Sequence, residues 1–138
     1  MIKRKLGRKR GHRVRMLNNL ATSVILYEKV KTTESKAKEA KSLVERYINL
    51  GKKADLVTRR RLLAMLTDRK AVAKVLEILS PRYKNMTSPV RIFKVGSRLG
   101  DAAPMAIIQL KEIEEKSPEI DKTIETKKNG KTKLSKNS

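Results

Sequence analysis

The chain contains no cysteine and only one histidine, His12. Without cysteine it cannot form disulfides, thiolate zinc sites or a cysteine nucleophile, which fits a reducing compartment. One histidine is too few for a metal cluster or a histidine-based triad. The core carboxylates lie at element ends or singly on a helix face, and no spacing pairs two of them on one surface, which argues against a two-metal nuclease; they are Asp55, Asp68, Glu77 and Asp101. We expect no catalytic residue, no metal and no cofactor.

Aromatic side chains are scarce, with three tyrosines, one phenylalanine and no tryptophan. They are too few and too scattered to form a base-stacking sheet. No apolar stretch approaches the roughly 18 residues of a membrane span. The basic start is not followed by the apolar stretch and cleavage site of a signal peptide. We therefore expect a soluble, intracellular protein with a modest aliphatic core.

Acidic residues are also scarce, since 14 Asp and Glu face 35 Lys and Arg, giving a formal net charge of +21. Eight cations lie between Lys3 and Arg15, and the first acid is Glu28. A polyanion that neutralises this charge is the expected partner. Nucleic acid is the first candidate and an anionic membrane surface the second. Residues 1–110 hold 27 cations and 8 anions, whereas residues 111–138 hold 8 and 6, so the positive excess lies in the first segment.

Hydrophobic periodicity predicts a helix over residues 13–28, because apolar residues recur at helical spacing there. Residues 29–33 alternate and include β-branched side chains, which predicts a short strand. A second helix then begins at Glu34, capped by Thr32 or Thr33, and Gly51 supplies its C-terminal stop.

Asp55 is a predicted cap for a third helix, and Thr67-Asp68 starts a fourth. The third helix is expected to face inward with Leu56, Leu62, Leu63 and Leu66. The fourth helix should end at Ser80-Pro81, because a residue before proline avoids helical angles. Residues 90–95 and 105–110 are predicted to pair as an antiparallel hairpin.

The loop between these strands contains two glycines but matches neither a nucleophile elbow nor a phosphate-cradling loop. Its glycines are expected to permit a turn, with Asp101 bonding local backbone and Arg98 projecting outward. Residues 1–11 are predicted to be a disordered basic arm, residues 12–111 a single folded domain, and residues 112–138 a disordered polar tail.

Two basic segments have a functional and a plain interpretation. The arm can follow a phosphate backbone, releasing counterions, or serve as a solubilising or targeting tail. Arg59, Arg60 and Arg61 point in three directions about 100° apart on a helix, so they form either a second contact patch or a solvated face. His12 beside Arg13 touches RNA or caps the helix start.

Three stretches of the chain resemble the bacterial large-subunit ribosomal protein seventeen family. The first is Leu6-Gly7-Arg8 with His12-Arg13, running into Met16-Leu17-x-Asn19-Leu20-Ala-Thr-Ser23. The second is Lys31-Thr-Thr33 followed by Lys36-Ala-Lys-Glu39. The third is Arg91-Ile-x-Lys94-x-Gly96-x-Arg98-x-Gly-Asp101-x-Ala-Pro-Met-Ala106. Asn18 departs from the family pattern, in which an arginine is common at that position.

The resemblance implies an α+β domain with a small three-stranded mixed sheet and about four helices. It also implies a non-catalytic constituent of the large ribosomal subunit that binds large-subunit ribosomal RNA near the nascent-chain tunnel exit and supports assembly and translation. The expected partners are that RNA and neighbouring ribosomal proteins, with no membrane and no small-molecule substrate. The predicted RNA-binding residues are Lys3, Arg4, Lys5, Arg8, Lys9, Arg10, His12, Arg13, Arg15, Arg59, Arg60, Arg91, Lys94 and Arg98.

Two other functions share part of this pattern. A free DNA-compacting protein needs the same charge and little sequence reading. A phosphate-cleaving enzyme would need a carboxylate or histidine cluster that the sequence lacks.

Overall fold

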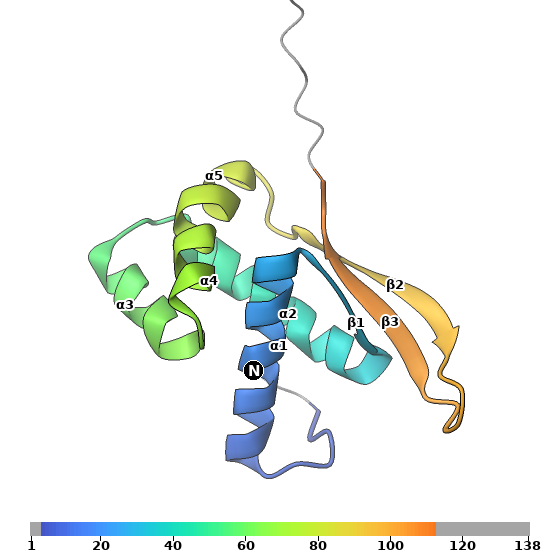
Figure 1. The fold of residues 1–138 in the computed structure, drawn as a ribbon. Coiled ribbons are helices and arrows are strands. Elements are labelled where there is room, and N and C mark those ends of the chain that lie inside the picture. The colour runs from blue at the N-terminus through green and yellow to red at the C-terminus, as the bar shows by residue number, and fades with distance from the viewer. Residues whose placement is uncertain (1–3, 113–138) are drawn as a thin grey trace, which may run out of the picture.

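The structure is a computed structural model that describes residues 4–112. Lys3 of the predicted arm and residues 113–138 of the predicted tail lie outside the described residues. Figure 1 shows helices gathered beside a small sheet whose hairpin reaches away from them. The predicted α+β class is confirmed. The elements in chain order are α1 (Arg10–Tyr27), β1 (Lys29–Thr33), α2 (Glu34–Gly51), α3 (Leu56–Met65), α4 (Arg69–Lys74), a π-helical turn η1 (Val75–Leu79), α5 (Ser80–Arg82), β2 (Val90–Ser97) and β3 (Pro104–Leu110).

Helix α1 begins at Arg10, three residues before the predicted start. The prediction followed the first apolar positions, whereas the helix extends by almost one more turn of exposed residues. It ends where Glu28 adopts a left-handed conformation (φ 60°) and donates its backbone N–H to Val24 O. This sharp end turns the chain directly into β1, whose predicted bounds are confirmed.

Helix α2 begins at Glu34 as predicted, but Gly51 does not act as a left-handed stop. Gly51 is the last helical residue and is buried. A Cβ atom at this position would collide with Ser80 Oγ and lie 2.8 Å from Val75 Cγ1. The glycine therefore permits close packing of the π-helical turn against the end of α2, which is a different reason from the predicted one.

Helix α3 is capped as predicted, because Asp55 accepts a hydrogen bond from Leu56 N at 3.1 Å. The predicted inward face is partly wrong. Leu62 and Leu66 are buried, but Leu56 is 62% and Leu63 43% exposed. Thr58 and Leu62, one turn apart, set the inward direction, and Leu63 lies about 100° around the helix from Leu62.

The predicted helix end at Ser80-Pro81 is also wrong, because helical backbone continues through α5 to Arg82. The Ser80 N–H bonds to Val75 O across the wider π-turn, and Tyr83 N–H bonds to Leu79 O. Backbone hydrogen bonds of helical type therefore continue on both sides of Pro81, which itself has no N–H to donate. Proline is tolerated here because it stands in the first turn of the short helix.

The sheet has the order β1-β3-β2, and both pairings are antiparallel. The predicted hairpin is confirmed, whereas the expected mixed sheet is corrected to an antiparallel one. The strand β3 lies between β1 and β2, so the two strands that run in the same direction are not neighbours. A bulge between Lys94 and Gly96 bends the outer end of β2.

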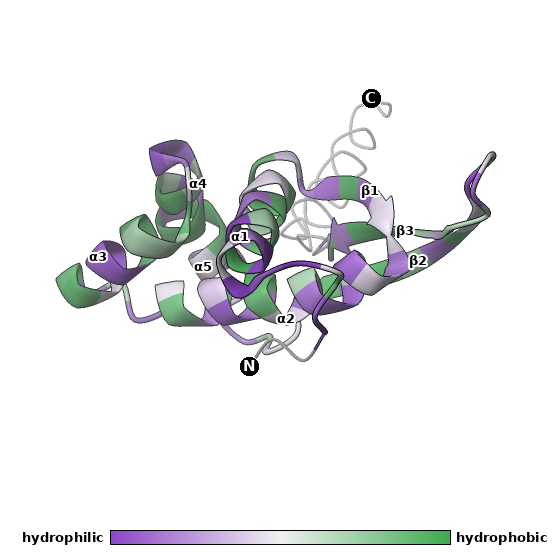
Figure 2. Ribbon diagram, turned by 90° about the horizontal axis from the view of Figure 1, so that it is seen from below, coloured by the Kyte–Doolittle hydropathy of each residue, from purple (hydrophilic) through white to green (hydrophobic). Residues whose placement is uncertain are grey.

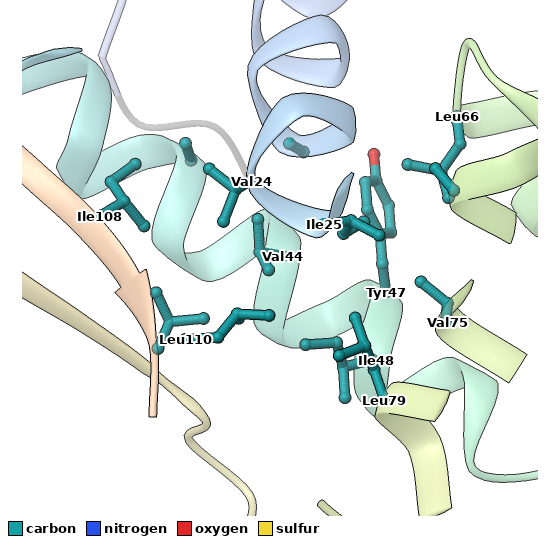
Figure 3. Packing of buried hydrophobic residues seen from close by; sticks show 14 of the residues in the cluster. Val24, Ile25, Val44, Tyr47, Ile48, Leu66, Val75, Leu79, Ile108 and Leu110 are labelled. Carbon is teal, nitrogen blue, oxygen red and sulfur yellow. The ribbon is translucent and has the colours of Figure 1, made fainter. Parts of the chain in front are cut away.

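The core lies where α2 passes between α1, the sheet and the later helices (Figure 3). Val44 and Tyr47 of α2 lie beside Val24 and Ile25 of α1, and Ile48 lies beside Leu79 of η1 (Figure 3). All these side chains are at most 3% exposed. Burial of each large aliphatic side chain contributes about 1.5–3 kcal/mol before conformational entropy is subtracted. This packing fixes α1 and α2 against each other.

Glu28 joins the end of α1 to the later helices. Its carboxylate lies 2.7 Å from Lys74 Nζ and 3.1 Å from Arg82 Nη1. Partial burial alone would raise the pKa of Glu28, but the hydrogen bond from Lys74 and the charges of Lys74 and Arg82 outweigh it, so the pKa is lowered. Lys74 Nζ also donates to Leu26 O at 2.9 Å, which completes this link.

Candidate nucleic-acid interface

The start of α1 has local electrostatics that favour an anion. Its first turn contains no acidic residue, and its N-cap residue, Lys9, makes no side-chain capping bond. A helix N-terminus carries unpaired N–H groups and a partial positive charge. Cations at that end repel the helix dipole, so Arg10 and Lys9 are unfavourably placed unless a negative group joins them. A phosphate satisfies both the N–H groups and the cations.

The described part of the arm folds back on this helix end. Leu6 and Gly7 both have positive φ, and Arg8 N–H bonds to Lys5 O at 3.2 Å, which makes a turn. Arg13 Nη1 donates to Arg8 O at 3.2 Å and to Lys5 O at 3.4 Å. Figure 2 brings this segment and the start of α1 toward the viewer, and both are largely hydrophilic. The predicted disorder of residues 1–11 in the free protein stays a prediction.

A hollow of about 570 Å³ lies between α1, α2 and the end of α3. It is lined by Arg10, Arg13, Val14, Asn18, Leu43, Arg46, Tyr47 and Met65. Three arginines from two helices therefore surround one opening. The Nε atom of Arg13 is buried and has no hydrogen-bond partner among the described residues.

A second hollow of about 370 Å³ adjoins the first, because Asn18 and Met65 line both. It adds Arg15 and Asn19 from α1 and the segment that follows α3. We call the two hollows together the arginine groove, defined by Arg10, Arg13, Arg15 and Arg46. Among residues 4–112 no carboxylate lines either hollow, so no acidic side chain of this part of the chain neutralises these arginines at the walls.

Polar side chains hold the walls of the groove in place. Tyr47 OH donates to Asn18 Oδ1 at 2.8 Å and ties α2 to α1. Thr67 Oγ1 donates to Asn19 Oδ1 at 2.7 Å and ties the end of α3 to α1. Desolvation by burial raises the pKa of Tyr47 above its usual value, against the opposing charge of Arg46. The hydroxyl therefore stays protonated and keeps donating near neutral pH.

The structure brings only some of the predicted residues together. Arg10, Arg13 and Arg15 line the groove, and Arg4, Lys5, Arg8 and Lys9 belong to the turn at the start of α1. Arg4 lies 3.9 Å from Glu39 of α2. His12 is exposed inside α1 and does not cap it, since the N-cap position is Lys9.

The remaining predicted residues lie elsewhere. Arg59 and Arg60 are exposed on α3, as is Arg61. Arg91, Lys94 and Arg98 belong to the hairpin, which extends from the opposite side of the molecule to α3 in both ribbon views (Figures 1 and 2). The thirteen predicted residues that the structure describes therefore lie on separate parts of the surface.

Arg98 has a carboxylate partner that the sequence analysis did not assign to it. Its Nε donates to Asp101 Oδ1 at 3.0 Å, and its Nη2 donates to Asp101 Oδ2. Asp101 Oδ1 also accepts from Ala103 N–H at 3.3 Å, so the predicted backbone bond is confirmed. The Arg98 hydrogen bond, with the Ala103 N–H, lowers the pKa of Asp101 to about 2. The tip of the hairpin thus carries a neutralised pair.

Sequence analysis missed Arg46. It lies on α2, one residue before the buried Tyr47, and has no basic neighbour in the sequence that would draw attention to it. The sequence did place it directly before Tyr47, one of the apolar residues on the buried face of α2, so helical geometry puts Arg46 at the edge of the face that packs on α1.

Within residues 4–112 no group of three His, Cys, Asp or Glu side chains could hold a metal ion. Among the same residues, no helix has the length and apolar character needed to cross a bilayer.

The chain is similar to ribosomal proteins over most of its length. The sequence model of the family described as Ribosomal protein L17 matches residues 16–111. A "Large ribosomal subunit protein bL17" from Syntrophotalea carbinolica is 44% identical over 125 residues, which cover 90% of this chain and 80% of that protein. The protein of the same description from Moorella thermoacetica is 49% identical over 111 residues, covering 80% and 99%. The one from Pelobacter propionicus is 47% identical over 112 residues, covering 80% and 88%.

Proposed function

This chain belongs to the ribosomal protein L17 family, and we propose that it binds large-subunit ribosomal RNA through the arginine groove and the start of α1. It is a structural, non-catalytic protein of the large ribosomal subunit. The single observation that carries the RNA contact is the groove itself, where Arg10, Arg13 and Arg46 converge without a lining carboxylate. A guanidinium group without a carboxylate partner binds phosphate in a bidentate geometry, and Arg13 does so with the N–H groups that are not already donated to Arg8 O and Lys5 O.

The shape of the site supports a contact with a backbone rather than with exposed bases. Tyr47 is 3% exposed and its hydroxyl is already bonded to Asn18, so it offers no stacking surface. The groove presents guanidinium groups and, at the start of α1, backbone N–H groups. Contacts of this kind position a protein on phosphates and carry no sequence information directly. The fold of the RNA, rather than its base sequence, then selects the binding place.

We propose further that the protein lies near the nascent-chain tunnel exit, where it contacts neighbouring ribosomal proteins and supports assembly and translation. Its role there is to neutralise phosphates that would repel one another as the RNA compacts. The arm, residues 1–11, extends this contact beyond the domain of residues 12–111. Arg59, Arg60, Arg91, Lys94 and Arg98 are secondary contacts in this proposal.

Crosslinking in intact large subunits tests the partner and the location together. Lysines at positions 3, 5 and 9 are crosslinked to RNA, and the attached RNA is sequenced. We expect crosslinks to a few segments of large-subunit RNA at the tunnel exit. Crosslinks scattered over the whole RNA, or located far from the exit, would contradict the location.

A competition experiment separates this function from DNA compaction. The purified full chain is bound to a large-subunit RNA fragment and challenged with duplex DNA of equal length at moderate salt. The proposal predicts that duplex DNA competes more weakly than unlabelled RNA fragment. Equal or better competition by the duplex favours a general DNA-binding protein.

A further inference from the structure

The sheet has one face that no described element covers. In β3 the side chains of Ala106, Ile108 and Leu110 are buried, whereas those between them are half-buried. The register places Phe93 and Lys31 on either side of Ile107. Phe93 is 48% exposed. We call this surface the outer face.

Cations border the apolar centre of the outer face. Arg91 and Lys29 flank Gln109 in the row next to Phe93, and both cations are exposed. The sequences of the three strands contain no carboxylate at all. The first acid to reach this face is Glu112, whose Oε1 accepts a hydrogen bond from Gln109 Nε2 at 3.3 Å. The chain therefore leaves β3 with its first carboxylate turned toward the outer face.

The segment that follows has the complementary chemistry. Residues 112–125 contain six of the 14 acids in the chain and two lysines, a net charge of −4. They also contain isoleucines at positions 113, 120 and 124. Residues 126–138 contain five lysines and no acid, a net charge of +5. The two halves of this terminus therefore differ in sign, and only the first half complements the outer face.

We propose that residues 113–125 dock on the outer face of the sheet in the free protein. Their carboxylates meet Lys29, Lys31 and Arg91, and their isoleucines cover the apolar centre at Phe93 and Ile107. A phosphate backbone would match the cations alone and leave this apolar centre without a counterpart. An acidic segment with spaced isoleucines matches both, which is why we assign the face of the free protein to this segment; RNA would replace the segment at Arg91 only in the assembled subunit.

Contact between this segment and the outer face costs little loop-closure entropy, because the two are close along the chain. The segment is attached to the C-terminal end of β3, the central strand, so it starts between β1 and β2 at one end of the sheet. Three strands span about 10 Å and a five-residue strand about 17 Å, whereas 13 extended residues reach about 43 Å. A short tether also gives an effective concentration on the order of millimolar, so weak charge pairs and a modest apolar contact suffice.

Paramagnetic relaxation tests the proposal directly, because the chain has no cysteine. A nitroxide is attached to Thr123→Cys in the isotope-labelled full chain, and amide signals are compared before and after reduction of the label. We expect selective broadening of the amides of Lys31, Phe93 and Ile107 at low salt. A label at Ser135→Cys, in the basic half, is the matched control and is expected to leave these signals unbroadened.

Two charge variants complete the test. Glu114→Lys with Glu115→Lys changes only the segment and leaves the sheet intact, and Arg91→Glu changes only the face. Each is expected to abolish the selective broadening from the label at position 123. Broadening that persists in both variants, or is equally strong from position 135, overturns the proposal.

Two other occupants give distinct results. If broadening also occurs when labelled and isotope-enriched chains are separate molecules in one mixture, the occupant is a second copy and the proposal is wrong. If position 123 broadens nothing while a ribosomal RNA fragment shifts the outer-face amides, the occupant is RNA. These outcomes do not depend on whether the arginine groove binds RNA.

Discussion

Replacing Gly51 by alanine reverses the usual effect of a glycine-to-alanine change in a helix. In open space this change stabilises a helix by about 0.5–1 kcal/mol. At Gly51 the new methyl group would collide with Ser80 Oγ and lie 2.8 Å from Val75 Cγ1, well inside the usual carbon–carbon contact of about 3.5–4.0 Å. Ser80 Oγ also donates to Ile48 O at 3.4 Å, so moving Ser80 away weakens that bond.

Overpacking of this kind costs about 1–3 kcal/mol. With the helix gain subtracted, we expect Gly51→Ala to lower the free energy of unfolding by about 1 kcal/mol. The melting temperature of a domain of this size then falls by about 4 °C. Urea unfolding of the full chain followed by circular dichroism measures the free energy, and thermal unfolding measures the melting temperature.

Gly11→Ala is the matched control, because Gly11 lies in α1 with nothing within 4 Å of the new Cβ. We expect it to be neutral or stabilising by up to about 1 kcal/mol. Adding Ser80→Ala to Gly51→Ala removes the clashing oxygen and should recover part of the loss, which a double-mutant cycle measures. The packing argument is refuted if both glycine variants stabilise equally.

Three further predictions concern single carboxylates. Glu28→Gln is expected to lower the free energy of unfolding at pH 7 by at most about 1 kcal/mol. Because the pKa of Glu28 in the folded chain is lowered from 4.5, this loss of stability should be constant above pH 4.5 and shrink as the pH falls below it. Urea unfolding at several pH values measures it. Asp68→Ala removes the acceptor of the Lys70 N–H, 2.8 Å away, and should lower the free energy of unfolding by about 1 kcal/mol. Asp68→Asn keeps an acceptor there and should retain most of the natural chain's stability in thermal unfolding. Arg98→Gln should raise the pKa of Asp101 from about 2 toward 3.8, and a carboxyl carbon shift that still titrates near 2 would contradict the paired geometry.

Local signals in the sequence were sufficient for most element bounds. The alternation of residues 29–33 and the change to helical spacing at Glu34 predicted β1 and the start of α2 as observed. Asp55 predicted the cap of α3 because a cap depends on neighbouring residues only. The hairpin pairing followed from two apolar strands around a glycine-containing loop.

The errors arose where distant segments or an irregular helical turn decide the outcome. Gly51 looks like a stop signal locally, but its role is set by Ser80, a neighbour only in the fold. Ser80-Pro81 looks like a break, yet the preceding π-turn carries the helical backbone through it. The antiparallel sheet depends on β3 inserting between β1 and β2, which no local pattern encodes.

The candidate site divides in the same way. Clusters of cations in the sequence led to the start of α1 and its first three arginines. Arg46 was missed because it stands alone in the sequence and joins the groove only through the packing of α2 on α1. The pairing of Arg98 with Asp101 depends on the turn at the tip of the hairpin, so a count of charges overestimated the free cations there.

The salt dependence of RNA binding tests the arginine groove most directly. Affinity for a large-subunit RNA fragment is measured against salt concentration for the full chain, for Arg10→Gln with Arg46→Gln, and for Lys29→Gln with Lys84→Gln, which removes the same charge outside the groove. Each phosphate contact contributes about 0.7–0.9 to the slope of log affinity against log salt. We predict that the groove variant loses about 1.4–1.8 from this slope while the control retains it. Equal slopes for the two variants would contradict the groove as the RNA site.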